Sequence, residues 1–182
     1  MGYAVEIYFD LQTEQSIWDL RHALIEQGIS SIASSMGDRP HISLAGFSNV
    51  DCDTLSSLVQ EYANSMEPFK VQLSAIGTFP TSENVLFLSP IPTSLLLNYH
   101  QEFHHRLAKS KLVPSSYYAP ENWMPHCTVE MKIPDEQLSK AIAIYKIAFK
   151  PLLGSFQEIG IVEFLPIKHL GTWSLTAETH QK

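Results

Sequence analysis

One short motif occurs twice in this chain of 182 residues, and its two copies lie roughly half the chain length apart. The copies are PHISL at residues 40–44 and PHCTV at residues 125–129, so each follows the pattern Pro-His-x-hydroxyl-aliphatic. Successive side chains of a β-strand point to opposite faces. In a strand, the imidazole and the hydroxyl of each copy therefore share one face, while the apolar residues occupy the other. The repeat predicts a chain built from two similar lobes, each contributing one His-bearing strand.

The elements expected around the two copies follow the same order, which is helix, loop, His-bearing strand, helix, strand. Alternating or short apolar runs indicate strands at residues 4–9, 41–47, 69–75, 85–88, 126–130, 156–165 and 169–176. Apolar residues at helical spacing indicate helices after Thr13, after Asp51 or Asp53, from Ser94 to Ser110 and from Asp135, with a loop at 30–38. We therefore expect an α+β fold in which two lobes share one core.

The residue types in the two motifs suit phosphoryl transfer without a metal. Two strands related by a pseudo-two-fold axis would face His41 and His126 across a shared cleft, where one imidazole takes a proton and the other donates one. The hydroxyls of Ser43 and Thr128 can donate hydrogen bonds to phosphate oxygens as negative charge builds there. The alternative is that both histidines only cap the starts of strands and bind backbone groups.

The paired motifs resemble those of the two-histidine (2H) phosphoesterase superfamily, which includes the 2′-5′ RNA ligase-like proteins and the cyclic phosphodiesterases. The resemblance implies one bilobal domain over residues 1–182, with two pseudo-two-fold-related antiparallel sheets, flanking helices and a central cleft. It implies cofactor-free, metal-independent chemistry on 2′,3′-cyclic or 2′-5′ ribose phosphates. His41 and His126 would then be the acid–base pair, and Ser43 and Thr128 the phosphate-binding hydroxyls. Which histidine is the acid is left open, because the superfamily uses both directions.

Four further residues are candidates for substrate contacts. Arg39 precedes the first motif and could neutralise a phosphate, or simply face solvent. Tyr118 and Trp123 lie in the Pro-rich segment before the second motif, where they could stack on a base or pack that loop down. Lys168 lies in the expected turn between the last two strands and could reach the rim of the cleft.

The charge and the cysteine content limit the partners and the compartment. A net charge of −7 argues against broad binding to DNA or long RNA, and it favours a small nucleotide or a short RNA end. No apolar run approaches the length that spans a bilayer, and the N-terminal residues lack the features of a secretory signal. Two cysteines, Cys52 and Cys127, fit a reducing compartment. We therefore expect a cytoplasmic monomer without a membrane partner.

Other functions remain as alternatives. Within the superfamily, these are 2′-5′ RNA ligation and 3′-end trimming of RNA by an exonuclease. Outside catalysis, the same scaffold could hold a nucleotide without turning it over. A metal-dependent hydrolase could use His100 and His104, which lie four residues apart on an expected helix, although edge and surface positions are the expected places for these side chains. Cys127 points away from His126 in a strand and is expected in the core.

Overall fold

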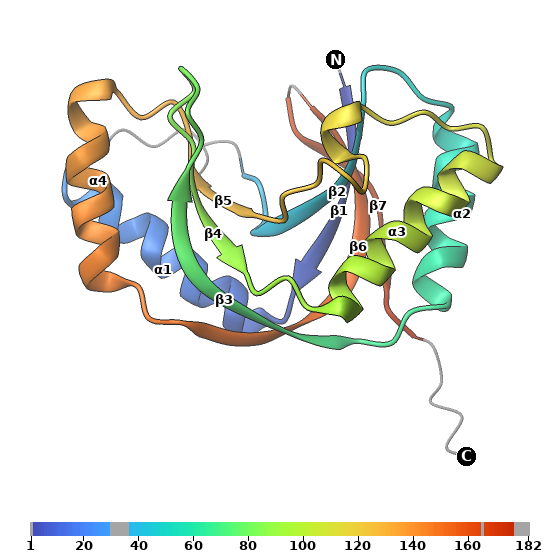
Figure 1. Ribbon diagram of the computed structural model, residues 1–182, viewed down its shortest axis with the longest axis horizontal. Helices are drawn as coiled ribbons and strands as arrows, with labels where there is room; N and C mark the ends of the chain where they lie inside the picture. Colours follow the sequence, from blue (N-terminus) through green and yellow to red (C-terminus); the bar gives the residue numbers. More distant parts are fainter. Residues whose placement is uncertain (1, 30–36, 165, 177–182) are drawn as a thin grey trace.

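The computed structural model describes residues 2–29, 37–164 and 166–176 (Figure 1). Most of the loop expected at 30–38 thus lies outside the described residues. Within them, seven strands, four α-helices and one 3-10 helix follow one another in this order: β1 (Gly2–Phe9), α1 (Leu11–Glu26), β2 (His41–Phe47), α2 (Cys52–Asn64), β3 (Phe69–Thr78), β4 (Leu86–Pro90), α3 (Ser94–Lys109), η1 (Ser116–Tyr118), β5 (Cys127–Glu130), α4 (Asp135–Ala148), β6 (Leu152–Phe164) and β7 (Lys168–Ser174).

All the strand pairs are antiparallel, and the α+β class with flanking helices is confirmed. The strands run in the order β2-β1-β6-β3-β4-β5, with β7 on the other edge of β6. The two lobes therefore share one hydrogen-bonded sheet rather than forming two. The reason is the length of β6, which has 13 residues. It pairs with β1 over residues 156–164 and with β3 over residues 152–156.

The curvature of this sheet brings the two motif strands together. β2 and β5 stand at opposite ends of the strand order, yet they contact each other. Figure 1 shows both in the middle of the molecule, with α1 and α4 on one side and α2 and α3 on the other. β2 covers residues 41–47, as expected, and β5 begins one residue after His126. Each motif histidine thus stands at the start of its strand.

The helix ends follow ordinary capping chemistry, with one correction. Asp51 caps α2 by accepting a hydrogen bond from the backbone N–H of Asp53, as one of the two expected caps. The expectation that Thr13 caps α1 was wrong. The Asp10 carboxylate is the cap, and Thr13 donates its backbone N–H to it at 2.9 Å from the first turn. Gly28 follows the helix at a φ of 74°, which a glycine adopts without strain.

Three aromatic rings fill the core where β6 changes partners. The ring of Phe156 stacks on that of Phe9 at 5.0 Å and contacts that of Phe69, also at 5.0 Å. All three side chains are buried, so one continuous core supports both halves of the sheet.

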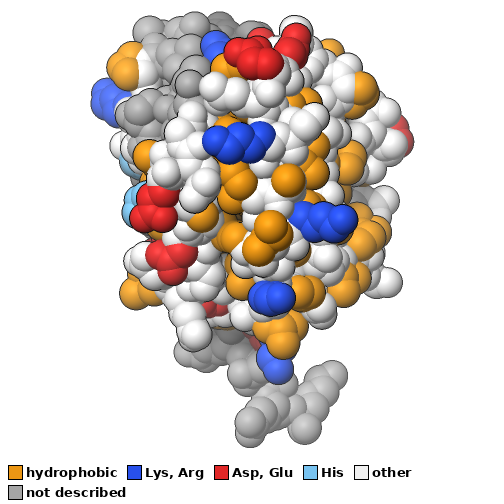
Figure 2. Space-filling model, turned by 90° about the vertical axis from the view of Figure 1, so that its left-hand side faces the viewer, with side chains coloured by type: hydrophobic (Ala, Val, Ile, Leu, Met, Phe, Trp, Pro, Cys, Tyr) orange, Lys and Arg blue, Asp and Glu red, His pale blue; other side chains and the backbone are white. Residues whose placement is uncertain are grey.

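The face that carries α4 shows no continuous basic patch. In Figure 2, the lysine and arginine side chains of this face stand apart, separated by hydrophobic and uncharged ones. This face therefore offers no unbroken basic track for a long nucleic acid. None of the helices among the described residues combines the length and the apolar character that a bilayer span needs.

Candidate active site

The two motif histidines are held in the same way. Nδ1 of His41 lies 2.7 Å from the backbone carbonyl of Arg39, and Nδ1 of His126 lies 2.7 Å from that of Met124. A carbonyl oxygen can only accept, so Nδ1 of each ring carries the hydrogen. Nε2 is then the atom of each imidazole that takes or gives a proton. The rings are also close enough for charge on His41 to lower the pKa of His126.

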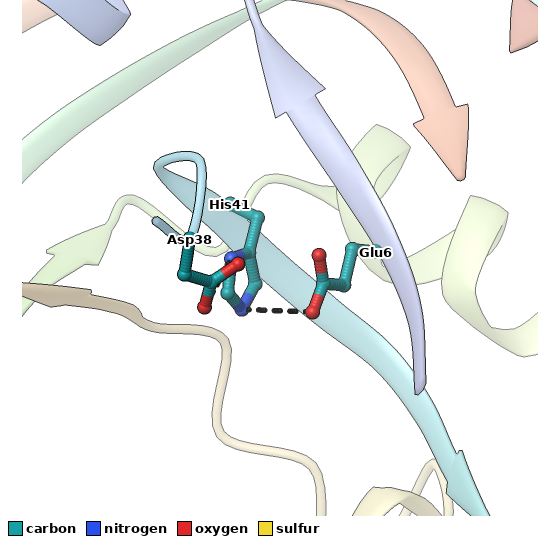
Figure 3. A group of neighbouring side chains, drawn as sticks. All are labelled: Glu6, Asp38 and His41. Atoms are coloured by element: carbon teal, nitrogen blue, oxygen red, sulfur yellow. Dashed lines mark ion pairs between the residues drawn. The ribbon is translucent and has the colours of Figure 1, made fainter. Parts of the chain in front are cut away.

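His41 lies between two carboxylates (Figure 3). Its Nε2 is 3.4 Å from Oε1 of Glu6, and its Nδ1 is 3.6 Å from Oδ2 of Asp38. Burial lowers the pKa of His41, but these two negative charges outweigh it and hold the pKa above its ordinary value. His41 therefore favours the protonated imidazolium form.

His126 has apolar surroundings instead. The ring of Phe79 meets it edge to face at 4.8 Å, and the ring of Phe87 lies at 5.4 Å. Burial lowers the pKa of His126, and the positive charge of His41 lowers it further, against the opposing hydrogen bond to Met124. His126 therefore favours the neutral form, whose Nε2 lone pair can accept a proton. Both imidazoles are therefore held by a backbone carbonyl at Nδ1, but their surroundings shift their pKa values in opposite directions.

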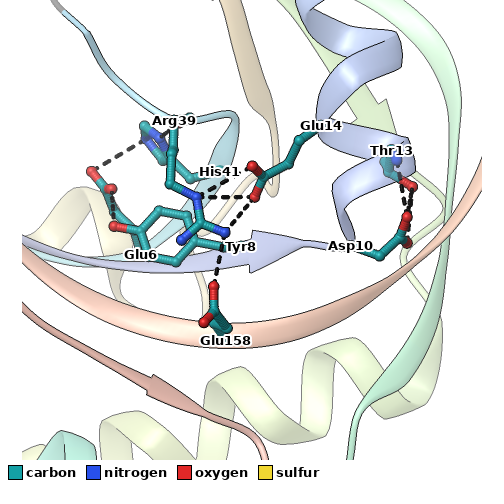
Figure 4. Close-up of polar contacts among 8 residues, drawn as sticks. All are labelled: Glu6, Tyr8, Asp10, Thr13, Glu14, Arg39, His41 and Glu158. Atoms are coloured by element: carbon teal, nitrogen blue, oxygen red, sulfur yellow. Dashed lines mark hydrogen bonds and ion pairs between the residues drawn. The ribbon is translucent and has the colours of Figure 1, made fainter.

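Glu6 enters the site from the neighbouring strand β1. The register of β1 against β2 sets Glu6 opposite Ser43 and Tyr8 opposite His41. Glu6 is 3% exposed, and its Oε2 accepts a hydrogen bond of 2.9 Å from the hydroxyl of Tyr8 (Figure 4). Burial raises the pKa of Glu6 to about 7, although the nearby charge of His41 acts in the opposite direction.

Arg39, a candidate for a substrate contact, forms ion pairs with two carboxylates of the chain. Its guanidinium lies 2.6 Å from a carboxylate oxygen of Glu14 and 2.8 Å from one of Glu158. The same group stands 4.2 Å above the ring of Tyr8. Figure 4 shows these contacts pointing away from His41. Because the charge of Arg39 is balanced by two carboxylates, we do not expect it to bind a phosphate.

The hydroxyl residue of the first motif opens onto a cavity of about 420 Å³. Ser43, Tyr118, Glu6 and Asp38 line it, together with Ala4, Met131, Lys132, Val162, Phe164 and Ile167. Burial raises the pKa of Tyr118, although its interaction with the side chain of Ser43 acts in the opposite direction. One side of the cavity is thus formed by polar side chains near the first motif, and the rest of its lining is mostly apolar. Lys168 is exposed at the start of β7, and it is not among the residues that line this cavity.

In the second motif, the side chain of Thr128 is partly exposed on β5, while Cys127 is buried in the core as predicted. The backbone carbonyl of Thr128 accepts a hydrogen bond of 3.0 Å from Arg21, which comes from α1. Arg21 also donates to the carbonyl of Asp38 at 2.9 Å. One buried side chain therefore ties the segments of both motifs together.

Trp123 fastens the Pro-rich segment rather than facing the cavity. Its Nε1 donates to the backbone carbonyl of Ser43 at 3.0 Å, and its ring stacks on that of His100 at 3.7 Å. Nε2 of His100 and Nε2 of His104 both contact the carbonyl of Leu44, at 3.1 and 3.0 Å. These ring nitrogens are engaged by backbone, which disfavours the metal site considered for this helix. His100 is buried, so its expected edge position was wrong.

The buried His100 predicts a measurable acid sensitivity. Burial lowers the pKa of His100 to about 3, so between that pH and about 6.5 the unfolded chain binds a proton that the folded chain does not. This residue's contribution to stability is therefore present above pH 6.5 and is lost as the pH falls. Around pH 5, each unit by which the pH is lowered should reduce the free energy of unfolding by up to about 1.4 kcal/mol more because of His100.

Urea titrations at several pH values test this expectation. His100→Gln keeps a donor for the Leu44 carbonyl and does not titrate, so its dependence between pH 6 and pH 4 should be shallower. His105→Gln is the matched control, because His105 is exposed on the same helix. Parallel curves for wild type and His100→Gln would contradict the prediction.

Sequence analysis missed Glu6 and Asp38, the two carboxylates beside His41. A signal existed for Glu6, because it is the acidic residue inside the otherwise apolar strand at 4–9. Its register against His41 could not be known from the sequence. The ligand atoms of Glu6, Asp38 and His41 all lie within 4.8 Å of one another. Both ring nitrogens of His41 have protein partners, namely Glu6 at Nε2 and the Arg39 carbonyl at Nδ1, so this cluster is an ion-paired imidazole rather than a metal site.

Comparisons with known proteins agree with this geometry. The model of the 2′-5′ RNA ligase superfamily matches residues 32–165. A Bacillus licheniformis protein that carries a phosphoesterase name is 24% identical over 111 residues, which are 59% of this chain and 62% of that protein. The chain therefore spans less than two thirds of the length of this curated relative.

Solved structures share the fold across nearly the whole chain. The protein TT0787 of Thermus thermophilus is similar with a TM-score of 0.67 and 16% identity, over 98% of this chain and 100% of that one. LigT of E. coli in its apo form is similar with a TM-score of 0.63 and 17% identity, over 96% and 97% of the two chains. Usb1 of Kluyveromyces marxianus has a TM-score of 0.55 and 13% identity, over 96% and 97%.

Proposed function

Because the chain belongs to the 2′-5′ RNA ligase superfamily of 2H phosphoesterases, we propose that it hydrolyses the 2′,3′-cyclic phosphate of a small nucleotide or of a short RNA end. The observation that carries this proposal is the matched pair of imidazoles. His41 and His126 are each fixed through Nδ1, so Nε2 is the atom of each ring that exchanges a proton, with that of His41 facing Glu6, and their environments favour opposite protonation states.

The proposed step needs only these groups and water. One imidazole takes a proton from water as the water oxygen attacks phosphorus, and the bond from phosphorus to one ribose oxygen breaks. The other imidazole gives its proton to that leaving oxygen, so the product is a phosphomonoester and a ribose hydroxyl. Ser43 and Thr128 donate hydrogen bonds to the oxygens that gain charge at phosphorus. Exchange of protons with solvent returns both imidazoles to their starting forms.

The cavity beside Ser43 supports a substrate of nucleotide size. Its volume of about 420 Å³ falls in the range of small-ligand sites, and Tyr118 and Phe164 supply ring surface to a nucleoside. LigT of E. coli, which shares this fold, has been solved in complex with 3′-AMP and with phosphate. The net charge of −7 also favours a short substrate over a long RNA.

A panel assay in EDTA tests the proposal. We expect hydrolysis of 2′,3′-cyclic mononucleotides to one phosphomonoester isomer, resolved by chromatography, at a rate that is unchanged by the chelator. Separate arms contain 2′-5′ dinucleotides, RNA half-molecules with ligatable ends and oligo-RNA 3′ ends. Ligation or trimming without cyclic phosphate hydrolysis would replace the proposal with the corresponding alternative. Tight nucleotide binding without any turnover would favour a binding module.

A further inference from the structure

The two imidazoles differ in one buried neighbour that their motifs do not contain. Glu6 belongs to β1, and its carboxylate is held on two sides at once. Oε2 accepts from the Tyr8 hydroxyl at 2.9 Å, while Oε1 stands 3.4 Å from Nε2 of His41. Nε2 is the atom of His41 that must give or take the proton, because Nδ1 already binds the Arg39 carbonyl. Around His126, the described ring contacts are those of Phe79 and Phe87.

We infer that Glu6 is a positioning residue that makes His41 the proton donor of the pair, by holding a buried carboxylate against its Nε2. The inference rests on the proposed function and deepens it, because it assigns the direction of proton flow. His41 enters the cycle as imidazolium and gives the Nε2 proton to the leaving ribose oxygen. His126, for which the described residues show no such carboxylate contact, accepts the proton of the attacking water.

The charges around His41 all bear on this assignment. The groups that face it are Glu6 and the Tyr8 ring from β1, Asp38 and the Arg39 carbonyl from its own segment, Arg21 from α1, and His126. Arg21 and burial oppose protonation, whereas Glu6 and Asp38 favour it. Glu6 is the more deeply buried of the two carboxylates, with its side chain 4% exposed against 21% for Asp38. Its charge is therefore the less screened by water.

Asp38 and Arg39 also lie near Glu6 and act on it through their charges, whereas Tyr8 forms a hydrogen bond with it. Arg39 is committed to Glu14 and Glu158, so it does not neutralise Glu6 directly. The hydroxyl of Tyr8 is a neutral donor, so it fixes the carboxylate without placing a positive charge beside it. Burial raises the pKa of Glu6 to about 7, which means that the proton of His41 and that of Glu6 are linked. Since His41 and Glu6 interact strongly, each midpoint measured for them belongs to the pair rather than to one residue.

A nuclear magnetic resonance titration of the imidazole Cε1–H signals tests the inference without any substrate. In Glu6→Gln, which keeps the shape and removes the charge, the midpoint of His41 should fall by about one pH unit, a tenfold loss of proton affinity. The midpoint of His126 should not fall with it. Glu158→Gln is the matched control, because it removes a carboxylate that binds Arg39 and not His41. An unchanged His41 midpoint in Glu6→Gln overturns the inference.

The pH profile of kcat/KM on a 2′,3′-cyclic nucleotide then tests the direction of proton flow. The alkaline limb reports the proton donor, so it should move to lower pH by about the same shift in Glu6→Gln, with KM nearly unchanged. Movement of the acidic limb alone would make His41 the base and overturn the assignment. A uniform loss of rate at every pH would mark Glu6 as merely structural.

A second variant keeps the test decisive if Glu6→Gln folds poorly by circular dichroism. Glu6→Asp keeps the charge and withdraws it by one methylene, so the His41 midpoint should fall by less than in the Gln variant. Compared with wild type alone, this fall should be smaller than about one pH unit, and a His41 midpoint in Glu6→Asp that equals or exceeds that of wild type would contradict the inference. If the wild type hydrolyses no cyclic phosphate, the proposed function fails. The magnetic resonance titration still decides whether the charge of Glu6 raises the proton affinity of His41.

Discussion

Replacing His126 by alanine should lower the turnover of a 2′,3′-cyclic nucleotide by about 10²–10⁴-fold, the usual contribution of a positioned acid or base. The variant removes the imidazole that is proposed to take the proton of water beside Phe79 and Phe87. KM should change far less than kcat, because Ser43 and Thr128, the proposed phosphate-binding hydroxyls, are retained. Initial rates over a range of substrate concentrations at neutral pH measure both parameters.

The fold of the His126 variant should persist, because its ring is partly exposed and its hydrogen bond is to a local carbonyl. Near-ultraviolet circular dichroism checks this directly. His41→Ala should show a loss of similar size, and the double variant little more than either single variant, because the pair acts as a unit. His105→Ala, an exposed histidine on α3, serves as the control. Near-normal hydrolysis by His126→Ala would rule out the proposed mechanism.

Arg21→Met should produce the largest loss of stability among these variants. The Arg21 side chain is 1% exposed and donates to the carbonyls of Asp38 and Thr128. Each hydrogen bond from a charged donor contributes about 1.5–3 kcal/mol, so the loss of both should cost about 3 kcal/mol after part is regained by removing a buried charge. For a domain of this size, the melting temperature should fall by about 6–12 °C.

Arg106→Met is the matched control for this change. Arg106 forms an ion pair with Glu102 one helical turn away on α3, and both side chains are partly exposed to water. Pairs of that kind contribute about 0.2–1 kcal/mol, so the control should melt within about 4 °C of wild type. Equal melting temperatures for Arg21→Met and Arg106→Met would show that the bridge between the two motif segments does not stabilise the fold.

The parts of this structure that sequence analysis predicted are those that local pattern determines. β2 begins and ends where the alternation of residues 41–47 places it, and Asp51 caps the helix that follows it. The paired motifs led to the two histidines because each motif is a continuous run of residues. Gly28 ends α1 as expected, since its φ of 74° is a local requirement.

Long-range pairing accounts for what sequence analysis missed. Nothing in residues 152–164 reveals that one strand pairs with β1 along one part and with β3 along another. The place of Glu6 beside His41 depends on the register of β1 against β2, which side-chain alternation cannot supply. Arg39 and Trp123 were candidates for substrate contacts, with solvent exposure and packing of the loop as the alternatives. Their partners, two carboxylates for Arg39 and the ring of His100 for Trp123, come from distant segments that the sequence does not place.

The shared strand β6 has a mechanical consequence for the site. A hinge between the two lobes would need to bend β6 near Phe156, where the strand passes from β1 to β3 and three aromatic rings are packed. Such bending would break ladder hydrogen bonds on both sides and open the core. The separation of the two imidazoles is therefore built into a stiff scaffold, and the adjustments that accompany substrate entry fall to side chains and loops. Little of the binding energy is then consumed in assembling the reactive groups.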